Sequence, residues 1–280
     1  MAEGDDVATG GTSGGDDSTV RWTALVLAGQ RPGIDPLADA FGVEWKALIP
    51  VGGVPMVDRV LRTLLACPQI GRIVVAGQAP DVLAQGWRAA EPRLSFTQSQ
   101  GGISRSIAAV AGTPTAPWPV LVTTADHPLL TPAMVATFLH GASDADVAVG
   151  MVERRTMLAA YPGTKRTWLR FRGGAYSGAN LFALRTPRAQ PALALWAQAE
   201  QDRKRALKLF WHFGPLLALR AITRTISGPS ALRTAGRRLG LDARLVALPQ
   251  AEAAIDVDKP ADHALAERIL AERSPHEPGQ

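Results

Sequence analysis

Residues 24–56 read ALVLAGQRPGIDPLADAFGVEWKALIPVGGVPM, and this stretch does most to decide the fold. It opens with an apolar, partly β-branched run, Ala24–Leu27, which is typical of a strand buried in a parallel sheet. Near Gly29 the backbone is free to turn sharply and to approach a ligand. Arg31 and Lys46 add two cations to the exposed N–H groups of this turn, a combination that suits a polyphosphate. The stretch therefore predicts a strand that leads into a phosphate-binding loop.

A second interpretation of the same residues is an ordinary strand-to-turn junction with solvated surface cations. However, Leu27–Arg31 reads LAG-x-R and Lys46–Met56 reads K-x-L-x-P-x-x-G-x-P-M. Together these motifs resemble the signature of the MobA-like NTP transferase family, in a shorter form than the common LAAG-x-G-x-R loop. The resemblance implies a nucleotidyltransferase of the GT-A-like fold, in which the nucleotide contacts of the first loop are Leu27, Ala28, Gly29 and Gln30.

The composition indicates a globular protein without membrane-spanning helices or disulfide bonds. The chain has 280 residues, 46% of them hydrophobic, which is ample for a core. It has no run of about 18 uncharged apolar residues, so we expect no membrane-spanning helix. The single cysteine, Cys67, excludes an internal disulfide and fits a reducing cytoplasm. We expect Cys67 to be buried at a helix end and not to act as a nucleophile.

The first 20 residues differ in composition from the rest. They contain five acidic residues and no Lys or Arg, and they are rich in Gly and Ser. We therefore expect residues 1–20 to form a disordered acidic tail and residues 21–275 to form a single domain. Because the whole chain is +5 at pH 7, this domain is distinctly basic. The positive electrostatic field of this domain suits a phosphorylated substrate or a membrane surface. We expect no nucleic-acid partner, because the sequence contains no recognised nucleic-acid-binding module.

Strand-like and helix-like runs alternate along the chain. Apolar β-type runs lie at 24–27, 72–76, 94–97, 120–123 and 147–149, and helical spacing of apolar residues marks 55–66, 103–111 and 132–140. This order predicts an α/β, Rossmann-like, mostly parallel sheet with helices on both faces. Ligands of such sheets bind beyond the carboxyl ends of the strands, so we expect the functional residues there.

Two acidic clusters follow apolar runs. Asp126 comes soon after the run 120–123, and Thr131 is the better cap for the next helix, which leaves Asp126 without a structural task. Asp256 and Asp258 are two residues apart, so an extended chain points both side chains to one side. Such carboxylates suit Mg²⁺, and the resemblance implies a metal role for both clusters. We expect Asp126, Asp256 and Asp258 to bind Mg²⁺, with helix capping as the alternative for Asp258.

A polar, glycine-bearing turn at 98–106 opens the helix-like run at 103–111. Helix N-terminal amides and small hydroxyls can read the edge of a nucleobase. The resemblance places base contacts in this turn, which implies nucleotide binding by Gln100, Gly101, Gly102 and Ser106. Helix capping by Ser104 is the competing explanation for the serines.

Residues 171–180, FRGGAYSGAN, are expected to form a loop between two strand-like runs. The resemblance places the acceptor-substrate loop here and favours acceptor contacts from Tyr176, Ser177 and Asn180. Lys165 and Arg166, just upstream, are placed to hold a phosphate of the acceptor. A plain hairpin loop is the alternative.

The segment 201–226, QDRKRALKLFWHFGPLLALRAITRTI, has no evident place in catalysis. It combines basic residues, apolar residues at helical spacing and an aromatic pair, and Pro215 starts a second short helix. A basic amphipathic helical insertion of this kind is typical of peripheral membrane contact. Packing on the sheet or on a second subunit is the alternative, and the sequence leaves the oligomeric state open.

These features predict a Mg²⁺-dependent nucleotidyltransferase, cytoplasmic or peripheral at the inner face of the membrane. It would transfer NMP from an NTP to a phosphorylated small-molecule or lipid-linked acceptor and release pyrophosphate. Arg31 and Lys46 are the catalytic candidates, because positioning and charge stabilisation suffice for this chemistry. The alternatives are a nucleotide-sugar-dependent glycosyltransferase and a non-catalytic nucleotide-binding or membrane-adaptor protein.

Overall fold

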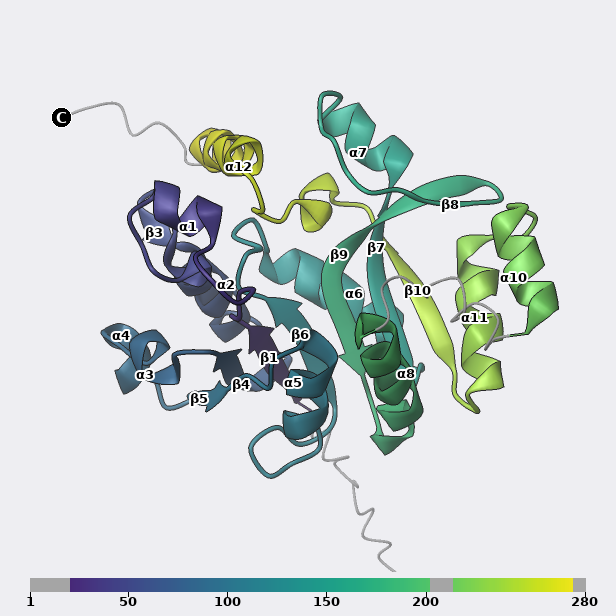
Figure 1. Ribbon diagram of the computed structural model, residues 1–280, viewed down its shortest axis with the longest axis horizontal. Coiled ribbons are helices and arrows are strands. Elements are labelled where there is room, and N and C mark those ends of the chain that lie inside the picture. The colour runs from purple at the N-terminus through teal and green to yellow at the C-terminus, as the bar shows by residue number, and fades with distance from the viewer. Residues whose placement is uncertain (1–20, 202–213, 274–280) are drawn as a thin grey trace, which may run out of the picture.

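The computed structural model describes residues 21–201 and 214–273. An eight-stranded sheet forms its centre (Figure 1), and a separate two-stranded pairing joins β2 (Pro50–Val51) to β3 (Val54–Pro55). The strands of the large sheet are β1 (Trp22–Leu27), β4 (Ile70–Gly77), β5 (Leu94–Gln98), β6 (Val120–Thr124), β7 (Val147–Glu153), β8 (Leu169–Phe171), β9 (Gly174–Leu184) and β10 (Ala243–Leu248).

The strand order is β10-β7-β9-β6-β1-β4-β5, with β8 paired on β9. The strand β1 pairs in parallel with β4 and β6, and β10 pairs in parallel with β7. In contrast, β9 runs antiparallel to β6, β7 and β8. The predicted mostly parallel Rossmann-like sheet is confirmed, and each of the five predicted β-type runs forms a strand.

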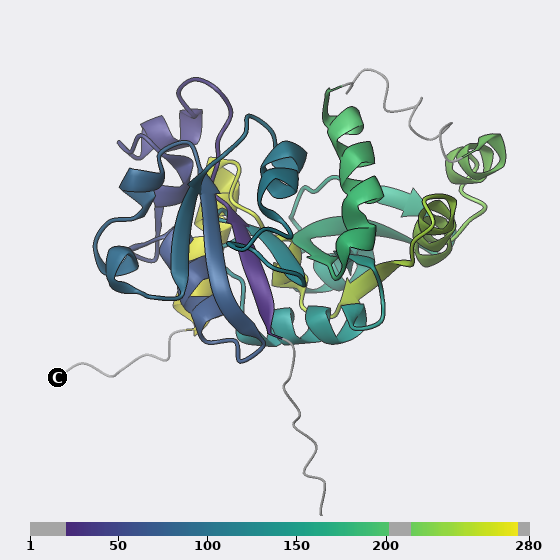
Figure 2. The ribbon, with the colours of Figure 1, turned by 90° about the horizontal axis from the view of Figure 1, so that it is seen from below.

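Helices connect the strands and cover both faces of the sheet (Figures 1 and 2). The helices are α1 (Pro36–Ala40), α2 (Met56–Leu65), α3 (Pro80–Leu83), α4 (Trp87–Ala90), α5 (Ile103–Val110), α6 (Pro132–Ala142), α7 (Arg154–Ala160), α8 (Gln190–Gln201), α10 (Pro215–Ile222), α11 (Gly228–Arg238) and α12 (Pro260–Arg273). The described residues also include the short 3-10 helices η1 (Lys46–Leu48), η2 (Pro187–Ala189) and η4 (Ala251–Ala254).

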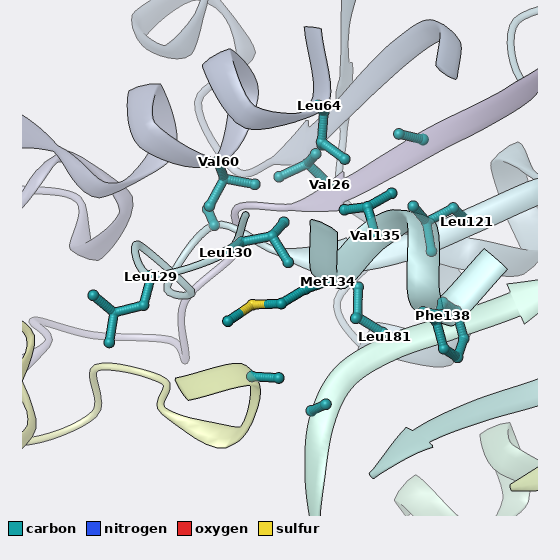
Figure 3. Close-up of a cluster of buried hydrophobic side chains, with 14 of the residues drawn as sticks. Val26, Val60, Leu64, Leu121, Leu129, Leu130, Met134, Val135, Phe138 and Leu181 are labelled. Carbon is teal, nitrogen blue, oxygen red and sulfur yellow. The ribbon is translucent and has the colours of Figure 1, made fainter. Parts of the chain in front are cut away.

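The side chains of β1 alternate between two hydrophobic cores, one on each face. Ala24 and Val26 belong to the core beneath α2 and α6, while Leu25 belongs to the core beneath α5 and α8. This period of two is why an uninterrupted apolar run makes a strand that is covered on both faces. Figure 3 shows the first core, where helix and sheet side chains meet: Val26, Leu121 and Leu181 with Val60, Leu64, Met134 and Phe138.

The expected loop at 171–180 was wrong. Arg172 and Gly173 make a tight turn, in which Gly173 has a φ of 86°, and the chain continues from Gly174 as β9. Glycine supplies that positive φ without a steric cost, so a short β8–β9 hairpin replaces the loop. Consequently, the residues assigned to an acceptor loop lie within a strand in the middle of the sheet.

Two expectations fall partly or wholly on residues that the structure does not describe. The acidic tail, 1–20, lies outside the described residues, as do residues 202–213 of the basic amphipathic segment. The second short helix predicted in that segment is present as α10. Within 21–201 and 214–273, no helix has both the length and the apolar character needed to cross a bilayer.

Candidate active site

The loop after β1 is held in place by two glutamine side chains. Gln78, which follows β4, accepts a hydrogen bond from the backbone N–H of Gln30 at 3.0 Å and donates one to its carbonyl oxygen at 2.5 Å. Gln30 in turn accepts from the backbone N–H of Lys46 at 2.8 Å and donates to the carbonyl of Glu44 at 3.2 Å. The two motif halves, LAG-x-R and the segment beginning at Lys46, are thereby tied together.

Gln78 was not predicted as a site residue, although it stands directly after a strand of the parallel sheet. The last backbone hydrogen bond between the β1 and β4 chain segments runs from the N–H of Ala28 to the carbonyl of Ala76, at 2.8 Å. Beyond it, the side-chain amide of Gln78 takes the place of a strand backbone, because it both accepts from and donates to the backbone of Gln30. A Cβ added at Gly29 would lie 3.4 Å from the Gln78 side-chain oxygen. Glycine therefore leaves room for this tie.

Lys46 stands between two carboxylates. Its Nζ lies 2.7 Å from Asp126 Oδ2 and 2.5 Å from Asp258 Oδ1, and its side chain is 13% exposed. Burial opposes the charged ammonium, but the two carboxylates more than offset this cost and raise the pKa of Lys46. Lys46 is thus a fixed cation. Asp258 pairs with Lys46, and α12 begins two residues later, at Pro260.

Backbone hydrogen bonds bring three chain segments together around this cluster. Ala125 N–H donates to the carbonyl of Leu27 at 2.9 Å, which fixes the segment after β6 beside the end of β1. Val257 N–H donates to the carbonyl of Asp126 at 2.9 Å. Asp256 and Asp258, which flank the fully buried Val257, are consequently held next to Asp126, although Asp256 follows η4 and not a strand as expected.

Asp256 is held by a buried guanidinium and an amide. Arg166 Nη1 donates to Asp256 Oδ1 at 2.6 Å, and Asn180 Nδ2 donates to Oδ2 at 3.2 Å. Burial, and then the nearby charges of Asp126 and Asp258, raise the pKa of Asp256, while Arg166 acts in the opposite direction. Asp126 and Asp258 therefore lie near enough to Asp256 to oppose its ionisation, and Lys46 and Arg166 supply the balancing positive charges.

Two cavities flank the cluster. The smaller, about 550 Å³, lies over the loop after β1 and is lined by Gln30, Arg31, Trp45 and Gln78 among others. The larger, about 990 Å³, lies between α7, β9 and α12, and its lining includes Lys165, Ser177, Asn180, Asp256 and Asp258. Trp45, which lines the smaller cavity, is the residue before Lys46, and Asp258, which lines the larger cavity, forms an ion pair with Lys46. The Lys46 cluster therefore connects the linings of the two cavities.

The predicted base-reading turn has its polar groups engaged within the protein. The Ser106 hydroxyl donates to the carbonyl of Gly102 at 2.7 Å and accepts from the N–H of Gln100 at 2.9 Å. The carboxylate of Glu200, from α8, accepts hydrogen bonds from the N–H groups of Ile103 and Ser104 at 2.8 and 3.0 Å. Ser106 thus holds the turn, and Glu200 caps α5. Glu200 was not predicted because it is distant in sequence.

The five predicted acceptor residues separate into two groups. Lys165, Arg166, Ser177 and Asn180 line the larger cavity. Asn180 has a φ of 50°, and the register between β7 and β9 shifts between Val149 and Met151. An irregularity of this kind is a β-bulge, which changes the direction of nearby side chains and is common next to active sites. Tyr176 does not join them: its hydroxyl donates to Glu153 at 3.4 Å and its ring packs near Phe171, because alternation along β9 places it away from the cavity.

Comparison with known proteins agrees with this geometry. The family model described as the MobA-like NTP transferase domain matches residues 24–224. A structure titled as a hypothetical transferase from Thermus thermophilus is 32% identical, with a TM-score of 0.72, and the match covers 87% of this chain and 99% of that one. No curated protein matches the sequence closely enough to be counted.

More distant structures share the fold alone. The CMP:2-keto-3-deoxy-manno-octonic acid synthetase complexed with CTP has a TM-score of 0.57 at 16% identity, covering 90% of this chain and 100% of its own. The 4-diphosphocytidyl-2C-methyl-D-erythritol synthase from Anaerococcus prevotii has a TM-score of 0.54 at 9% identity, covering 90% and 98%. Their folds are those of nucleotidyltransferases of the GT-A-like type. The motif loop, the sheet and the family model that matches residues 24–224 together show that the chain belongs to the MobA-like NTP transferase family.

Proposed function

We propose that this protein is a Mg²⁺-dependent nucleotidyltransferase that joins NMP from an NTP to a phosphorylated acceptor. An anionic oxygen of the acceptor phosphate attacks the α-phosphorus of the NTP. The bond from the α-phosphorus to the oxygen bridging it to the β-phosphorus breaks, and pyrophosphate leaves with the electron pair. The observation that carries the proposal is the Lys46 cluster, which connects a cavity at the motif loop to a second cavity whose lining holds both cations, Lys165 and Arg166 among them, and carboxylates.

The residues present fit a magnesium ion that is shared with substrate. Asp126 Oδ1 is buried and has no hydrogen-bond partner in the part of the chain that the structure describes. Among those same residues, no group of three or more His, Cys, Asp or Glu side chains is arranged to hold a metal ion. A magnesium ion shared with substrate requires fewer protein ligands, because Mg²⁺ takes one or two carboxylates and completes its shell with phosphate oxygens and water. Asp126 and Asp256 would hold the ion, which would neutralise charge on the phosphates.

The other side chains bind and orient the two substrates. The amides near Gly29, with Arg31, suit the β- and γ-phosphates in the smaller cavity. Lys46 offsets the charge that builds on the α-phosphoryl group, and Gln30 fixes its backbone for that task. Arg166, with a buried and unpartnered Nε among the described residues, and Lys165 suit the acceptor phosphate. An acceptor phosphate is already anionic, so no general base is required.

The test is pyrophosphate release by the purified protein with Mg²⁺ and each NTP in turn, CTP among them because a structurally similar protein holds it. The acceptor panel covers sugar phosphates, polyol phosphates, a pterin-type cofactor and lipid-linked phosphates. At least one pair is expected to give turnover that stops when the metal is chelated. Turnover with a nucleotide sugar in place of an NTP would instead assign the chain to glycosyl transfer.

Asp126→Asn is the diagnostic variant, because it removes a charge without removing volume. We expect it to lower turnover at least roughly a hundredfold. Asp144→Asn is the matched control, since Asp144 is exposed before β7, at the opposite edge of the sheet. Equal loss of activity in both variants would contradict the proposed role of Asp126.

A further inference from the structure

The outer face of α10 carries large apolar side chains that no other part of residues 21–201 and 214–273 covers. Leu216, Leu219 and Ile222 are 64%, 58% and 59% exposed, whereas Leu217 and Ala218 on the opposite side are buried. A spacing of three residues keeps the exposed set on one side of a helix. We call these three residues the α10 patch. Single exposed apolar residues are ordinary, but three side by side on one helix mark a contact surface.

The charge around the α10 patch has one sign. Residues 203–241 contain no Asp or Glu. Within the described part of that segment, exposed arginines stand on and beside α10 and on the neighbouring α11: Arg220, Arg224, Arg233, Arg237 and Arg238. Apolar side chains on a segment whose charged residues are all cationic complement a surface that is anionic outside and apolar beneath.

The shape of this region suits a flat surface. In both views α10 lies at the far end of the molecule, beyond α11 and β10 (Figures 1 and 2). Its apolar residues project from a convex helix, which can enter the headgroup region of a bilayer by the depth of one helical face. The α10–α11 connection is also joined to the turn that follows β8, because Arg172 N–H donates to the carbonyl of Ile226 at 2.9 Å. Leu169, the first residue of β8, lines the larger cavity.

We propose that the α10 patch and its arginines dock the protein on an anionic lipid bilayer. The apolar side chains enter the interface and the arginines pair with anionic headgroups. One backbone hydrogen bond, from Arg172 to Ile226, links the segment after α10 to the β8–β9 hairpin, and Leu169 of that hairpin lines the larger cavity. The proposal concerns binding alone, so its test does not depend on nucleotidyl transfer.

Vesicle co-sedimentation of the full chain tests this surface. The probes are phosphatidylcholine vesicles with and without phosphatidylglycerol, at low and at high salt. The wild type is expected to bind only the anionic vesicles, and less at high salt. Leu216→Ser/Leu219→Ser/Ile222→Ser should weaken binding at least about a hundredfold. Arg220→Glu/Arg224→Glu should weaken it at least about thirtyfold.

The matched control is Arg62→Glu/Arg72→Glu, which makes the same change in charge at exposed positions on α2 and β4, at the opposite end of the molecule. It should bind as the wild type does, and all variants should keep the wild-type circular dichroism. The control also loses the Arg62–Trp87 cation–π contact and the Arg72 hydrogen bond to Pro114, so binding is compared at a temperature at which every variant is folded. Three outcomes overturn the proposal. They are no binding to anionic vesicles, equal binding by the triple-serine variant, and a dimer that this variant converts to a monomer in sedimentation analysis, which would show that a second copy covers the patch.

Discussion

Among single residues, Lys46 has two effects that oppose each other. It supplies positive charge for the α-phosphoryl group, but it also pairs with Asp126, one of the two proposed magnesium ligands, and with the neighbouring Asp258. Lys46→Met should therefore lower the rate of pyrophosphate release roughly a hundred- to thousandfold. The same variant should reach its half-maximal residual rate at a lower Mg²⁺ concentration than the wild type, because its carboxylates have lost their competing cation.

A magnesium titration of the residual activity measures both effects. Lys46→Arg, which keeps the charge, should retain the magnesium requirement of the wild type. A Lys46→Met enzyme that needs more Mg²⁺, or that keeps its full rate, would show that this residue serves only to bind nucleotide.

Gln78 tests whether the loop must be held in place. Gln78→Ala removes both hydrogen bonds to the backbone of Gln30 and so frees the loop that positions Lys46. We expect kcat/KM for the NTP to fall roughly ten- to a hundredfold. Gln69→Ala is the control, since Gln69 is an exposed glutamine just before the other end of β4. Similar kinetics in the two variants would argue against the tie.

Cys67 gives a pH dependence of stability. The residue lies just beyond α2 and is 1% exposed, and this burial raises the pKa of its thiol to about 11 from an ordinary value of 9.0. The unfolded chain therefore loses this proton first as pH rises. The contribution of Cys67 to the free energy of unfolding should be constant below about pH 9 and should fall by roughly 2–3 kcal/mol between about pH 9 and 11. Denaturant unfolding of the wild type and Cys67→Ala over this range measures the difference, and parallel curves would refute it.

At the scale of elements, α5 depends on a cap from a distant helix. Glu200→Ala removes the carboxylate that accepts from Ile103 and Ser104 at the start of α5. The expected cost is about 1 kcal/mol, with a higher KM for the NTP if this turn contacts the base. Glu272→Ala, at an exposed position on α12, should change stability by less than about 0.5 kcal/mol. Thermal unfolding measures the stability of the two variants, and equal melting temperatures would show that Glu200 does not stabilise the start of α5.

The elements that could be predicted from sequence are those with a clear apolar pattern. The β1 run is continuously apolar, the α2 stripe has helical spacing, and Thr131 with Pro132 marks the start of α6 as expected. In contrast, β9 contains Gly174 and Gly178, residues that are rare in strands, so its pattern indicates a loop. Its pairing with β6 and β7 comes from tertiary contacts, which local propensity does not report.

For the whole molecule, the site is assembled from four separate segments: the loop after β1, the Lys46 turn, the end of β6 and residues 256–258. The motif identifies the first two, and carboxylates after apolar runs indicate the others. The sequence could not show that the Gln78 side chain binds the loop after β1. It also could not show that the Ser106 hydroxyl is hydrogen-bonded within its own turn, or that the Tyr176 side chain lies away from the larger cavity. These depend on hydrogen-bond partners 48, 6 and 23 residues distant along the chain.

The central claim is that a nucleotidyl group passes between the two cavities at the Lys46 cluster. The most direct measurement follows an NTP that is radiolabelled in its α-phosphate, with Mg²⁺ and the acceptor that supports turnover. The account predicts that label moves to the acceptor, that one pyrophosphate is released for each transfer, and that Asp126→Asn abolishes both. Pyrophosphate release without label on the acceptor, or transfer that persists unchanged in Asp126→Asn, would contradict it.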